Sequence, residues 1–426
     1  MLSKKENELV TRTGAGTPMG DVFRRYWVPA LLSEEIPEPD CPPVRVRLLG
    51  EGLVAFRDSQ GRVGLLDEYC RHRRASLFFG RNEECGLRCV YHGWKYDVEG
   101  HVLDTPAEPA DSRLKERVRA IAYPCREANG VVFTYMGPAE KMPLFPSFEW
   151  LTLPAPHVGV TKFGLDCNYL QALEGDCDTS HTAYLHRGNN GEGLAAPTDS
   201  PPSFEIERTW CGLRAAALRT ARPDKSGRPD ASGRDHRYVR VSTFAMPFIG
   251  NVARGPMTSE GKLDGFLCVY QVPADDHHTW RYNFRFRRSS PVEPGEHLID
   301  HDREQVGPDY RPFANRDNGY LLDRGKQRTR NYTGVDGFAT QDACITESMG
   351  RITDRSLERL GASDGYVIAL RAFLLKAVKD FQHGGEPPGL AFDPAQNDYS
   401  ATTCTWLTIP ADGNWRELEA ETYALA

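Results

Sequence analysis

Two pairs of metal-binding residue types lie early in the chain, Cys70-x-His72 and, after 16 intervening residues, Cys89-x-x-His92. Each pair fits into one tight turn, and the interval between them is long enough to form a hairpin that brings both turns together. A [2Fe–2S] cluster takes two protein ligands on each iron, and histidines can replace cysteines on one iron, which raises the reduction potential. The mixed set of two cysteines and two histidines therefore predicts such a cluster.

Two other interpretations of these residues are open. A structural zinc site also takes two cysteines and two histidines, but a zinc finger pairs like with like and continues into a helix. Here each pair holds one residue of each type, and strand-like residues flank both pairs. Chance is the other interpretation, since Cys85 and Cys125 show that further cysteines occur nearby. Gly86 and Gly93 would allow the backbone to approach the sulfurs, so we predict a metal site and favour iron–sulfur over zinc.

A second group of candidate ligands lies in LEGDCDTSHTAYLHRG, where Asp178-x-x-His181-x4-His186 is found. On a regular α-helix, Asp178 and His181 would lie about 60° apart, but His181 and His186 would lie about 140° apart. We therefore expect a helix with a bulge or an end between Ala183 and Leu185 if both histidines bind one metal. A non-haem Fe(II) site takes two histidines and one carboxylate and leaves one face open for oxygen and substrate. The spacing alone does not identify that carboxylate.

The elements that would position these residues fall into distinct regions. Runs such as VRVRLLG, LVAFRD and GVVFTYMG, separated by turn residues, predict a small all-β domain. TGAGTPMG is interpreted as a turn that starts a helical segment. The clearest helix is SDGYVIALRAFLLKAVKDFQHGG, which Ser363 or Asp364 would cap and Gly384 would end. The predicted regions are an N-terminal helical segment packed with the C-terminal domain (1–37), the all-β domain (38–140), a proline-rich linker (141–156) and a mixed C-terminal domain (157–426).

Composition excludes several classes of partner. The formal net charge is -7 and no basic stripe stands out, so neither nucleic acid nor an anionic membrane is an expected partner. No apolar stretch approaches the roughly 18 residues of a membrane span, and MLSKKENELV is polar where a signal peptide needs an apolar core. The 11 cysteines are odd in number and scattered, which argues against a disulfide framework. Cys167, Cys211 and Cys268 are expected to be buried thiols, and the protein is expected to be cytoplasmic.

The motif C-x-H…C-x-x-H-G-W resembles the Rieske domain in the large (alpha) subunits of ring-hydroxylating oxygenases. RTGAGTPMG and FATQDACITESMGRITDRSLERLG are similar to the branch that contains phthalate dioxygenase and aromatic O-demethylases. The resemblance implies an α+β protein with an all-β Rieske [2Fe–2S] domain. It also implies a catalytic domain with a central antiparallel sheet, helix-grip-like, that carries a mononuclear iron. Cys70 and Cys89 would bind one iron of the cluster, and His72 and His92 the other.

One position departs from the family pattern. Arg71 follows the first cysteine, where the family usually has proline. We expect this difference to alter the reduction potential or the surface that meets a reductase, without removing a ligand. Cys85 falls outside the ligand pattern and is given no role.

For the mononuclear iron, the resemblance implies His181, His186 and a distant aspartate as ligands. The family's aspartate follows a glutamine, which identifies Asp342 here, with Asp336 and Asp354 as the alternatives. Without the resemblance, Asp342 would be interpreted as a carboxylate near a helix N-terminus that accepts hydrogen bonds from free amides.

The resemblance gives Asp178 a different role from that of a ligand. In the family this aspartate bridges the iron-binding His181 and a Rieske histidine of a neighbouring subunit, because the two centres of one subunit are too far apart. A homotrimer, or two stacked trimers, is therefore implied. The chain holds no flavin or nicotinamide fingerprint and no plant-type C-x4-C-x2-C spacing. Electrons from NAD(P)H are therefore expected to come through a separate reductase with flavin and an iron–sulfur cluster.

Relatives of this branch use O2 on aromatic carboxylates, either to dihydroxylate the ring or to remove a methyl group from a methoxy substituent. The sequence does not separate these two reactions. An anionic substrate needs a basic partner in an otherwise apolar pocket. Arg240 is the preferred candidate and Arg208 the second, although an arginine on a strand usually faces water or a surface acid.

Two alternative functions remain at this stage. A Rieske-type electron carrier joined to an inert domain explains the first constellation but not Asp178, His181, His186 and Asp342. A structural zinc protein explains the first constellation in another way and would lack iron altogether.

Overall fold

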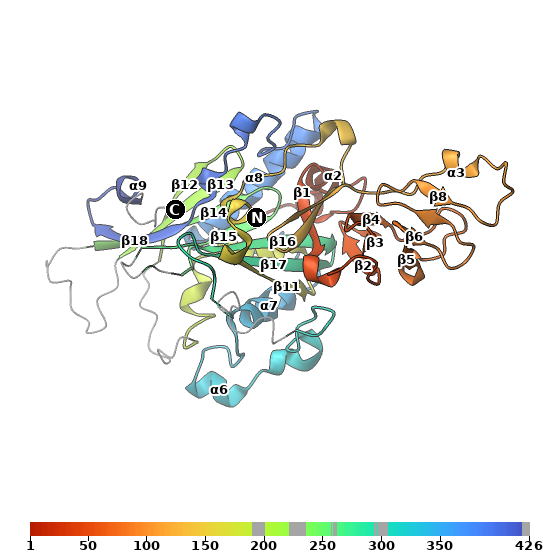
Figure 1. Cartoon of the computed structure of the whole chain (residues 1–426). Coiled ribbons are helices and arrows are strands. Elements are labelled where there is room, and N and C mark those ends of the chain that lie inside the picture. Colours follow the sequence, from red (N-terminus) through yellow and green to blue (C-terminus); the bar gives the residue numbers. More distant parts are fainter. Residues whose placement is uncertain are drawn as a thin grey trace.

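The computed structural model describes residues 1–189, 201–220, 236–256, 258, 262–293, 295 and 306–419. Figure 1 shows a large twisted sheet with helices beside it and a smaller all-β body that projects to one side. The predicted α+β class is confirmed, with the all-β part first in the chain. The domain boundaries proposed from the sequence remain a prediction.

The small body is built from short antiparallel sheets whose turns carry glycines at positive φ, such as Gly61 and Gly100. Its sheets are β2 (Val44–Leu48) with β3 (Glu51–Arg57) and β4 (Val63–Asp67); β5 (Arg81–Glu83) with β6 (Gly86–Arg88), β7 (Lys95–Tyr96) and β8 (Val102–Asp104); and β1 (Trp27–Leu32) with β10 (Val131–Tyr135) and β9 (Cys125–Ala128). In β2 valine and leucine alternate with arginine, so that Val46 and Leu48 are buried while Arg45 and Arg47 face outward. The short helix α3 (Leu114–Arg117) follows β8.

The large sheet is antiparallel and runs in the order β11-β17-β16-β15-β14-β13-β12. Its strands are β11 (Val158–Leu165), β12 (Ser203–Arg208), β13 (Gly212–Thr220), β14 (His236–Ala245), β15 (Ile249–Val252), β16 (Leu267–Asp275), β17 (His278–Phe286) and β18 (Thr405–Pro410). The sheet branches at β14, because residues 243–245 pair with the short β15 while residues 236–241 pair with β18.

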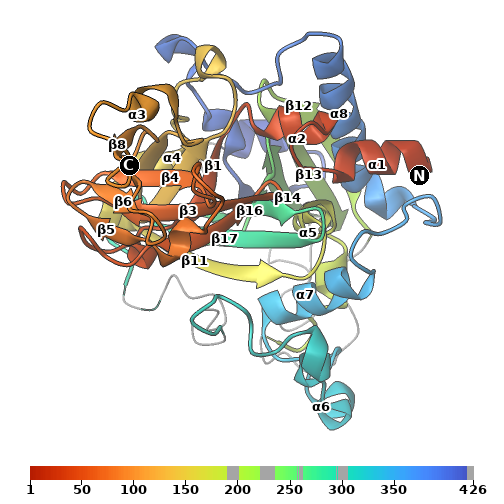
Figure 2. The ribbon, with the colours of Figure 1, turned by 90° about the vertical axis from the view of Figure 1, so that its right-hand side faces the viewer.

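Side chains of the large sheet alternate between two different environments. Gln271 and Arg281 are directly paired and point toward the helices, where they approach Asp176 of α5 (Tyr169–Cys177) and Asp342 of α7 (Phe338–Ser348). Phe244 packs on the same face against α8 (Gly365–Gln382). Figure 2 shows α7 below β11 and α8 beside β12 and β13. This face is therefore the one that the helices cover.

The opposite face of the large sheet is apolar and packs against the small body. Phe133 of β10 packs on Tyr270 and Phe284. Trp150, fully buried in α4 (Glu149–Thr152), donates a hydrogen bond to the Tyr270 hydroxyl at 3.3 Å. The proline-rich segment 141–156 is thus packed along this face.

The N-terminal segment is helical only in part. In α1 (Lys4–Thr11) a capping box joins Ser3 and Glu6, and TGAGTPMG forms the predicted turn, with Thr17 capping α2 (Pro18–Phe23). The prediction of a helical segment over 1–37 is wrong for β1, which pairs with β10 in the small body. Most side chains of WVPALL are buried, on both faces of that strand, and its aromatic and β-branched residues favour a strand.

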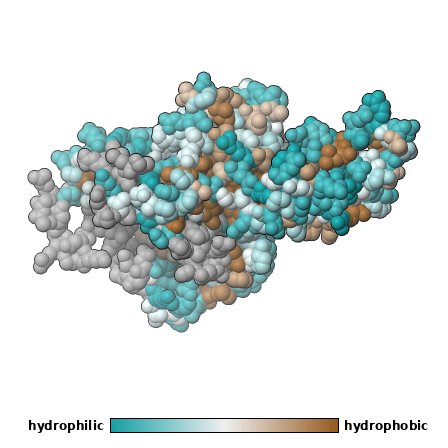
Figure 3. All heavy atoms as spheres, in the orientation of Figure 1, coloured by the Kyte–Doolittle hydropathy of each residue, from teal (hydrophilic) through white to brown (hydrophobic). Residues whose placement is uncertain are grey.

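The remaining helices include α6 (Arg324–Thr329) and α9 (Trp415–Leu418). As predicted, α8 ends where Gly384 adopts a positive φ of 88°. On the face seen in Figure 3, hydrophilic residues predominate and apolar residues lie in small groups. Within the described ranges, no helix has the length and apolarity needed to cross a lipid bilayer.

A buried ion network fixes α5, whose C-terminal end leads into the second group of candidate ligands. Glu174 of α5 accepts hydrogen bonds from Arg355 and from Arg371 of α8, and Arg355 donates to Asn7 of α1 at 3.0 Å. Burial raises the pKa of Glu174, but the two arginines outweigh burial and hold it below its ordinary value. Arg355 is fully buried, so loss of its partner would leave an uncompensated charge in the interior.

We predict that Glu174→Gln lowers the free energy of unfolding by about 3–5 kcal/mol, because two buried arginines would lose their shared counter-charge. Chemical denaturation would measure the change. The matched control is Asp380→Asn, which breaks the exposed Lys376–Asp380 pair on α8 and is expected to cost about 0.5 kcal/mol or less. Equal losses in the two variants would contradict the assignment.

Candidate metal centres

The first two candidate pairs occupy matching turns of the small body. Cys70 follows β4, and its N–H donates to the Ala75 carbonyl at 2.9 Å. Cys89 follows β6, and its N–H donates to the Trp94 carbonyl at 2.8 Å. Each turn thus closes within six residues and carries one cysteine and one histidine. The long interval between the pairs contains β5 and β6, as a hairpin arm.

The two cysteine side chains meet in the core of the small body. Both are buried, and Sγ of Cys70 lies 3.1 Å from the Tyr96 hydroxyl. Hydrogen bonding with the Cys89 thiol, then with Tyr96 and the backbone amide of His72, lowers the pKa of Cys70 to about 5. The same contact raises the pKa of Cys89. A thiolate is the form of cysteine that binds metals, so the environment already stabilises one sulfur ligand.

The two imidazole rings lie close together, edge to face. The rings of His72 and His92 lie 4.5 Å apart, and His72 stacks on the Trp94 indole at 4.9 Å with 2° between the ring planes. Nδ1 of His72 is buried and has no hydrogen-bond partner in the described part of the chain. A buried polar atom of this kind normally has a partner, so a metal bound at Nδ1 fits the site.

The nearby glycines have different roles from one another. Gly93 adopts a φ of 77° and donates to the Cys89 carbonyl at 3.0 Å, so it closes the second turn. The predicted role of Gly86 in approaching the sulfurs is wrong. A Cβ at Gly86 would lie 2.6 Å from the Tyr96 carbonyl, so this glycine permits close pairing of β6 with β7. Arg71 pairs with Asp67 at 3.5 Å, and the Cys85 N–H donates to Ser59.

The second group of ligands does not lie on a helix, which corrects the expectation from the sequence. α5 ends at Cys177, and Asp178 follows it with extended backbone angles. The Asp178 carboxylate accepts the Ser180 N–H at 2.6 Å, which replaces a helical hydrogen bond with a local turn. His181 therefore begins a separate single turn, His181–Ala183. The two histidines are freed from the helical angle of about 100° per residue.

This turn brings both histidines to α7. Nε2 of His186 lies 3.1 Å from Oδ1 of Asp342, and Nε2 of His181 lies 3.7 Å from the same oxygen. One ligand atom from each residue lies within 4.8 Å of the others. The alternatives are placed elsewhere: Asp336 pairs with Lys326, and Asp354 accepts from Ser356. Of the three proposed carboxylates, Asp342 is the one beside the histidines.

Each of the two histidines has another partner at its second ring nitrogen. Nδ1 of His181 lies 3.6 Å from Oδ2 of Asp178, and Nδ1 of His186 lies 2.8 Å from Oε1 of Gln341. Gln341 donates through Nε2 to the Val335 carbonyl, so its Oε1 faces the imidazole as an acceptor. An acceptor at Nδ1 leaves Nε2 of the imidazole free for a metal.

Oδ2 of Asp342 faces Arg281, whose side chain is 9% exposed and lies 3.8 Å away. Arg281 also lies 3.8 Å from Asp176, which accepts from Gln271 at 2.7 Å. Arg281, Gln341 and Tyr96 were not predicted from the sequence. Gln341 adjoins Asp342 in the sequence, but the positions of the other two depend on strand pairing.

The electrostatics of the second group favour a bound cation. Burial raises the pKa of Asp342, but His186, His181 and Arg281 outweigh it and hold the pKa below its ordinary value. Burial lowers the pKa of His181, whereas Asp178 and Asp342 more than reverse that effect. Two imidazole nitrogens and one carboxylate at this spacing are the donor set of a non-haem Fe(II) site.

The two proposed substrate arginines lie at different positions on the large sheet, Arg240 in the middle of β14 and Arg208 at the end of β12. Arg240 of β14 contributes to the charge felt by His181, and its Nε is buried with no hydrogen-bond partner in the part of the chain described. Arg208, at the end of β12, is exposed and lies over Phe373 of α8 at 5.8 Å. Arg240 pairs with Ala217, whereas Arg208 pairs with Leu213, four residues earlier in β13. A separation of about 13 Å along the strand keeps the two arginines from sharing one carboxylate.

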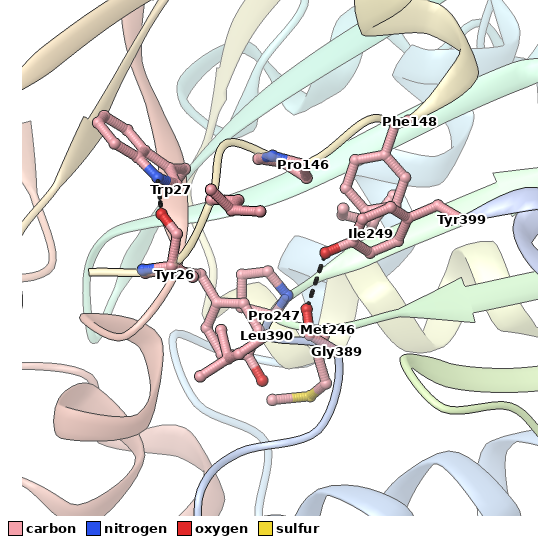
Figure 4. A pocket seen from close by; sticks show the side chains of 12 residues that line it. Tyr26, Trp27, Pro146, Phe148, Met246, Pro247, Ile249, Gly389, Leu390 and Tyr399 are labelled. Atoms are coloured by element: carbon pink, nitrogen blue, oxygen red, sulfur yellow. Dashed lines mark hydrogen bonds between the residues drawn. The ribbon is translucent and has the colours of Figure 1, made fainter. Parts of the chain in front are cut away.

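An apolar pocket on the other face of the large sheet is not part of this centre. Tyr26, Trp27, Leu390 and Tyr399 line it, and Figure 4 shows these side chains around the turn that leads into β15. Ile249 of β15 also lines this pocket, whereas the next residue, Gly250, packs against Asp176 on the face with the helices. Because neighbouring strand residues point to opposite faces, the sheet separates the pocket from the histidines.

Comparisons with known proteins cover both bodies of the molecule. The Rieske [2Fe-2S] domain family matches residues 26–124, and the family described as "LigXa C-terminal domain like" matches residues 134–425. The chain is 38% identical to the phthalate 4,5-dioxygenase oxygenase subunit of Pseudomonas putida, over 99% of this chain and 95% of the relative. It is 37% identical to the 3-chlorobenzoate-3,4-dioxygenase oxygenase subunit of Comamonas testosteroni, over 97% of each.

More distant relatives extend the range of activities in the group. The chain is 29% identical to the 5,5'-dehydrodivanillate O-demethylase oxygenase subunit of a Sphingobium strain, over 93% of this chain and 85% of the relative. The solved structure of NdmA from Pseudomonas putida CBB5 has a TM-score of 0.61 at 20% identity and covers 93% of this chain and 99% of that one. At this identity the structural likeness concerns the fold alone.

The matched families decide between the functions considered from the sequence. A Rieske domain carries a [2Fe–2S] cluster, which excludes the structural zinc protein. The second family match covers residues 134–425, and the first oxygenase relative aligns with 99% of this chain. These matches exclude an electron carrier joined to an inert domain. The family also implies a mononuclear iron. The chain therefore belongs to the Rieske non-haem iron aromatic oxygenases, as an oxygenase (alpha) subunit of the phthalate dioxygenase-like branch.

Proposed function

We propose that this chain is the terminal oxygenase of a multicomponent system that hydroxylates an aromatic carboxylate with O2 and electrons from a reductase. The observation that carries the proposal is the meeting of His181, His186 and Asp342 on the helix-covered sheet face, which also holds Arg240, four residues before Phe244 in β14. The reaction is either dihydroxylation of a ring, as in phthalate oxygenation, or O-demethylation of a methoxylated acid. The relatives described above include a dioxygenase and an O-demethylase.

We assign the iron ligands residue by residue. Cys70 and Cys89 hold one iron of the cluster, and His72 and His92 hold the other. The mononuclear iron is held by His181, His186 and Asp342. When bound, the cluster supplies single electrons and the mononuclear iron is where oxygen is activated. Arg281 balances the charge of the partly buried Asp342, and Gln341 fixes the proton of His186 on Nδ1.

Asp178 is suited to connect two subunits. Its Oδ2 faces Nδ1 of His181, while 28% of its side chain is exposed, so the carboxylate reaches the molecular surface. A carboxylate in this position accepts N–H from an imidazole on either side. We therefore propose that Asp178 joins His181 to a Rieske histidine of a neighbouring subunit, in a homotrimer or in two stacked trimers. The reductase, which carries flavin and an iron–sulfur cluster, supplies the electrons from NAD(P)H.

The proposed activity is tested by metal content and a substrate screen. The oxygenase should hold about three irons per chain, two in the cluster and one at the mononuclear site. The screen presents phthalates, benzoates and methoxylated aromatic acids with a partner reductase and records oxygen uptake and formaldehyde. Formaldehyde with uptake indicates O-demethylation, and uptake without formaldehyde indicates ring hydroxylation. Absence of substrate-dependent uptake across the screen would contradict the proposal.

We predict that Asp178→Asn keeps both iron centres but lowers turnover by about 10- to 100-fold or more, because the neutral amide no longer stabilises the imidazole proton. Iron analysis and the electron-resonance signal of the reduced cluster would show that both centres are intact. Single-turnover kinetics would then follow oxidation of the cluster. Asp336→Asn makes the same chemical change at an exposed ion pair and should leave these rates unchanged. Native turnover in Asp178→Asn would refute the bridge.

We predict that Arg240→Gln raises KM for a carboxylate substrate by about 10- to 100-fold, because a hydrogen bond to a charged group contributes about 1.5–3 kcal/mol. The effect on kcat should be small if the arginine binds the carboxylate equally well throughout the reaction. Arg208→Gln is the matched control, since that arginine is exposed over Phe373. With a methyl ester of the same acid as substrate, the native protein and Arg240→Gln should have similar KM values. An unchanged KM would rule out Arg240 as the anchor.

A further inference from the structure

Arg219 connects the large sheet to the turn that carries the second group of ligands. It lies near the end of β13 and is buried. Its Nη2 donates hydrogen bonds to the Thr179 carbonyl at 3.0 Å and to the Thr179 hydroxyl oxygen at 2.8 Å. Thr179 is itself buried and directly follows Asp178. A strand of the large sheet therefore holds the residue next to the proposed bridge by two hydrogen bonds.

The Thr179 carbonyl shares its peptide bond with the Ser180 N–H. A trans peptide bond is planar, so its C=O and N–H groups point in opposite directions within one plane. The Ser180 N–H donates to Oδ1 of Asp178 at 2.6 Å. A guanidinium that fixes the direction of this carbonyl therefore also fixes the direction of the N–H. With Oδ1 bound in this way, Oδ2 of Asp178 is the oxygen that faces Nδ1 of His181, at 3.6 Å.

The positive charge of Arg219 strengthens the same arrangement. A carbonyl that accepts a hydrogen bond from a charged donor polarises its peptide group, which makes the N–H of that group a better donor. The Thr182 hydroxyl also donates to the Thr179 carbonyl, at 3.1 Å, but Thr182 belongs to the turn and moves with it. Because α5 ends at Cys177, this peptide is not part of a helix. Its contact with Arg219 is the one that ties it to the sheet.

We propose that Arg219 is a positioning residue that holds the peptide between Thr179 and Ser180 and thereby orients the Asp178 carboxylate. In that orientation one oxygen faces His181, and the carboxylate is presented to the Rieske histidine of the neighbouring subunit. This inference rests on the proposed role of Asp178 as the bridge between subunits. It makes a strand of the sheet responsible for the geometry of the bridge.

The place of Arg219 on the sheet suggests a second role, in substrate binding, which experiment can separate from the first. Arg219 pairs with Tyr238, two residues from Arg240 in β14, so the two arginines are diagonal neighbours on one face. An arginine that binds the substrate carboxylate changes KM. An arginine that orients the bridge changes the rate at which the reduced cluster is oxidised and leaves KM unchanged.

The first test uses Thr179→Val, which removes the hydroxyl acceptor but keeps the backbone carbonyl and a side chain of similar size. The rate of cluster oxidation in a single turnover, with the aromatic acid identified by the screen above, should fall by about 3- to 10-fold. The loss should be smaller than in Asp178→Asn, because the carboxylate itself is retained. Thr179→Ser keeps the hydroxyl and should restore the native rate. Iron content and KM should be unchanged in both variants.

The matched control is Thr329→Val, which alters an exposed threonine of α6 and should leave the rate unchanged. A crystal structure of Thr179→Val gives a readout that needs no substrate. In that structure the Ser180 N–H should no longer lie within hydrogen-bond distance of Oδ1 of Asp178. Retention of the native carboxylate position would overturn the inference.

Arg219→Lys tests the arginine itself, because lysine keeps the charge but lacks the planar fork of donors. Its oxidation rate should lie between those of the native protein and Asp178→Asn. A double-mutant cycle then shows whether Arg219 and Thr179 act through the carboxylate. In an Asp178→Asn background, neither Arg219→Lys nor Thr179→Val should slow cluster oxidation further. Independent, multiplicative losses in that background would overturn the proposal.

The remaining outcomes separate this inference from the proposed function. Native oxidation rates in both Thr179→Val and Arg219→Lys would overturn the positioning role while leaving the bridge intact. A raised KM with a native oxidation rate in Arg219→Lys would assign the arginine to substrate binding and would also overturn it. Native turnover in Asp178→Asn would instead refute the bridge on which the inference rests.

Discussion

Neighbouring residues of a β-strand point to opposite faces of a sheet, and this alternation decides where chemistry takes place in the large domain. One face of the sheet presents Gln271, Arg281 and Arg240 to the helices, and the opposite face presents Tyr270 and its aromatic neighbours to the small body. A shift of one residue in the pairing of β17 with β16 would turn every side chain of β17 to the other face, Arg281 included. The charged partner of Asp342 would then point into an apolar core.

Polar groups removed from water need partners, and in the second centre neighbouring side chains supply them. Asp342 faces two imidazoles through one oxygen and a guanidinium through the other. The guanidinium is in turn held between Asp342 and Asp176. These charged side chains lie in a region of low dielectric constant, where a charge without a partner would destabilise the fold.

The two centres differ in how much of each was predictable from sequence. Cys70 with His72, and Cys89 with His92, each lie within one turn, so local spacing alone identified them. His181 and His186 were found by spacing, but the end of α5 at Cys177 was missed, because a carboxylate-to-backbone turn at Asp178 replaced the helix. Local turns of this kind compete closely with helical hydrogen bonds.

Contacts between distant segments were not predictable from residue types. Asp342 lies 156 positions after His186, and only the resemblance to a family selected it over Asp336 and Asp354. Arg281 reaches the site because of the register of β17, which no local pattern specifies. The helical reading of β1 failed for a related reason: its partner, β10, follows about a hundred residues later.

The branch at β14 has a consequence for how the chain acquires its shape during synthesis. β14 carries Arg240, which pairs with Trp406 of β18 on one side and with Ala217 of β13 on the other. Until residues 405–410 leave the ribosome, one edge of β14 is exposed and able to pair with other chains. The catalytic half therefore closes only after residues 405–410 have been synthesised, and a chain cut short before residue 405 would be prone to aggregation.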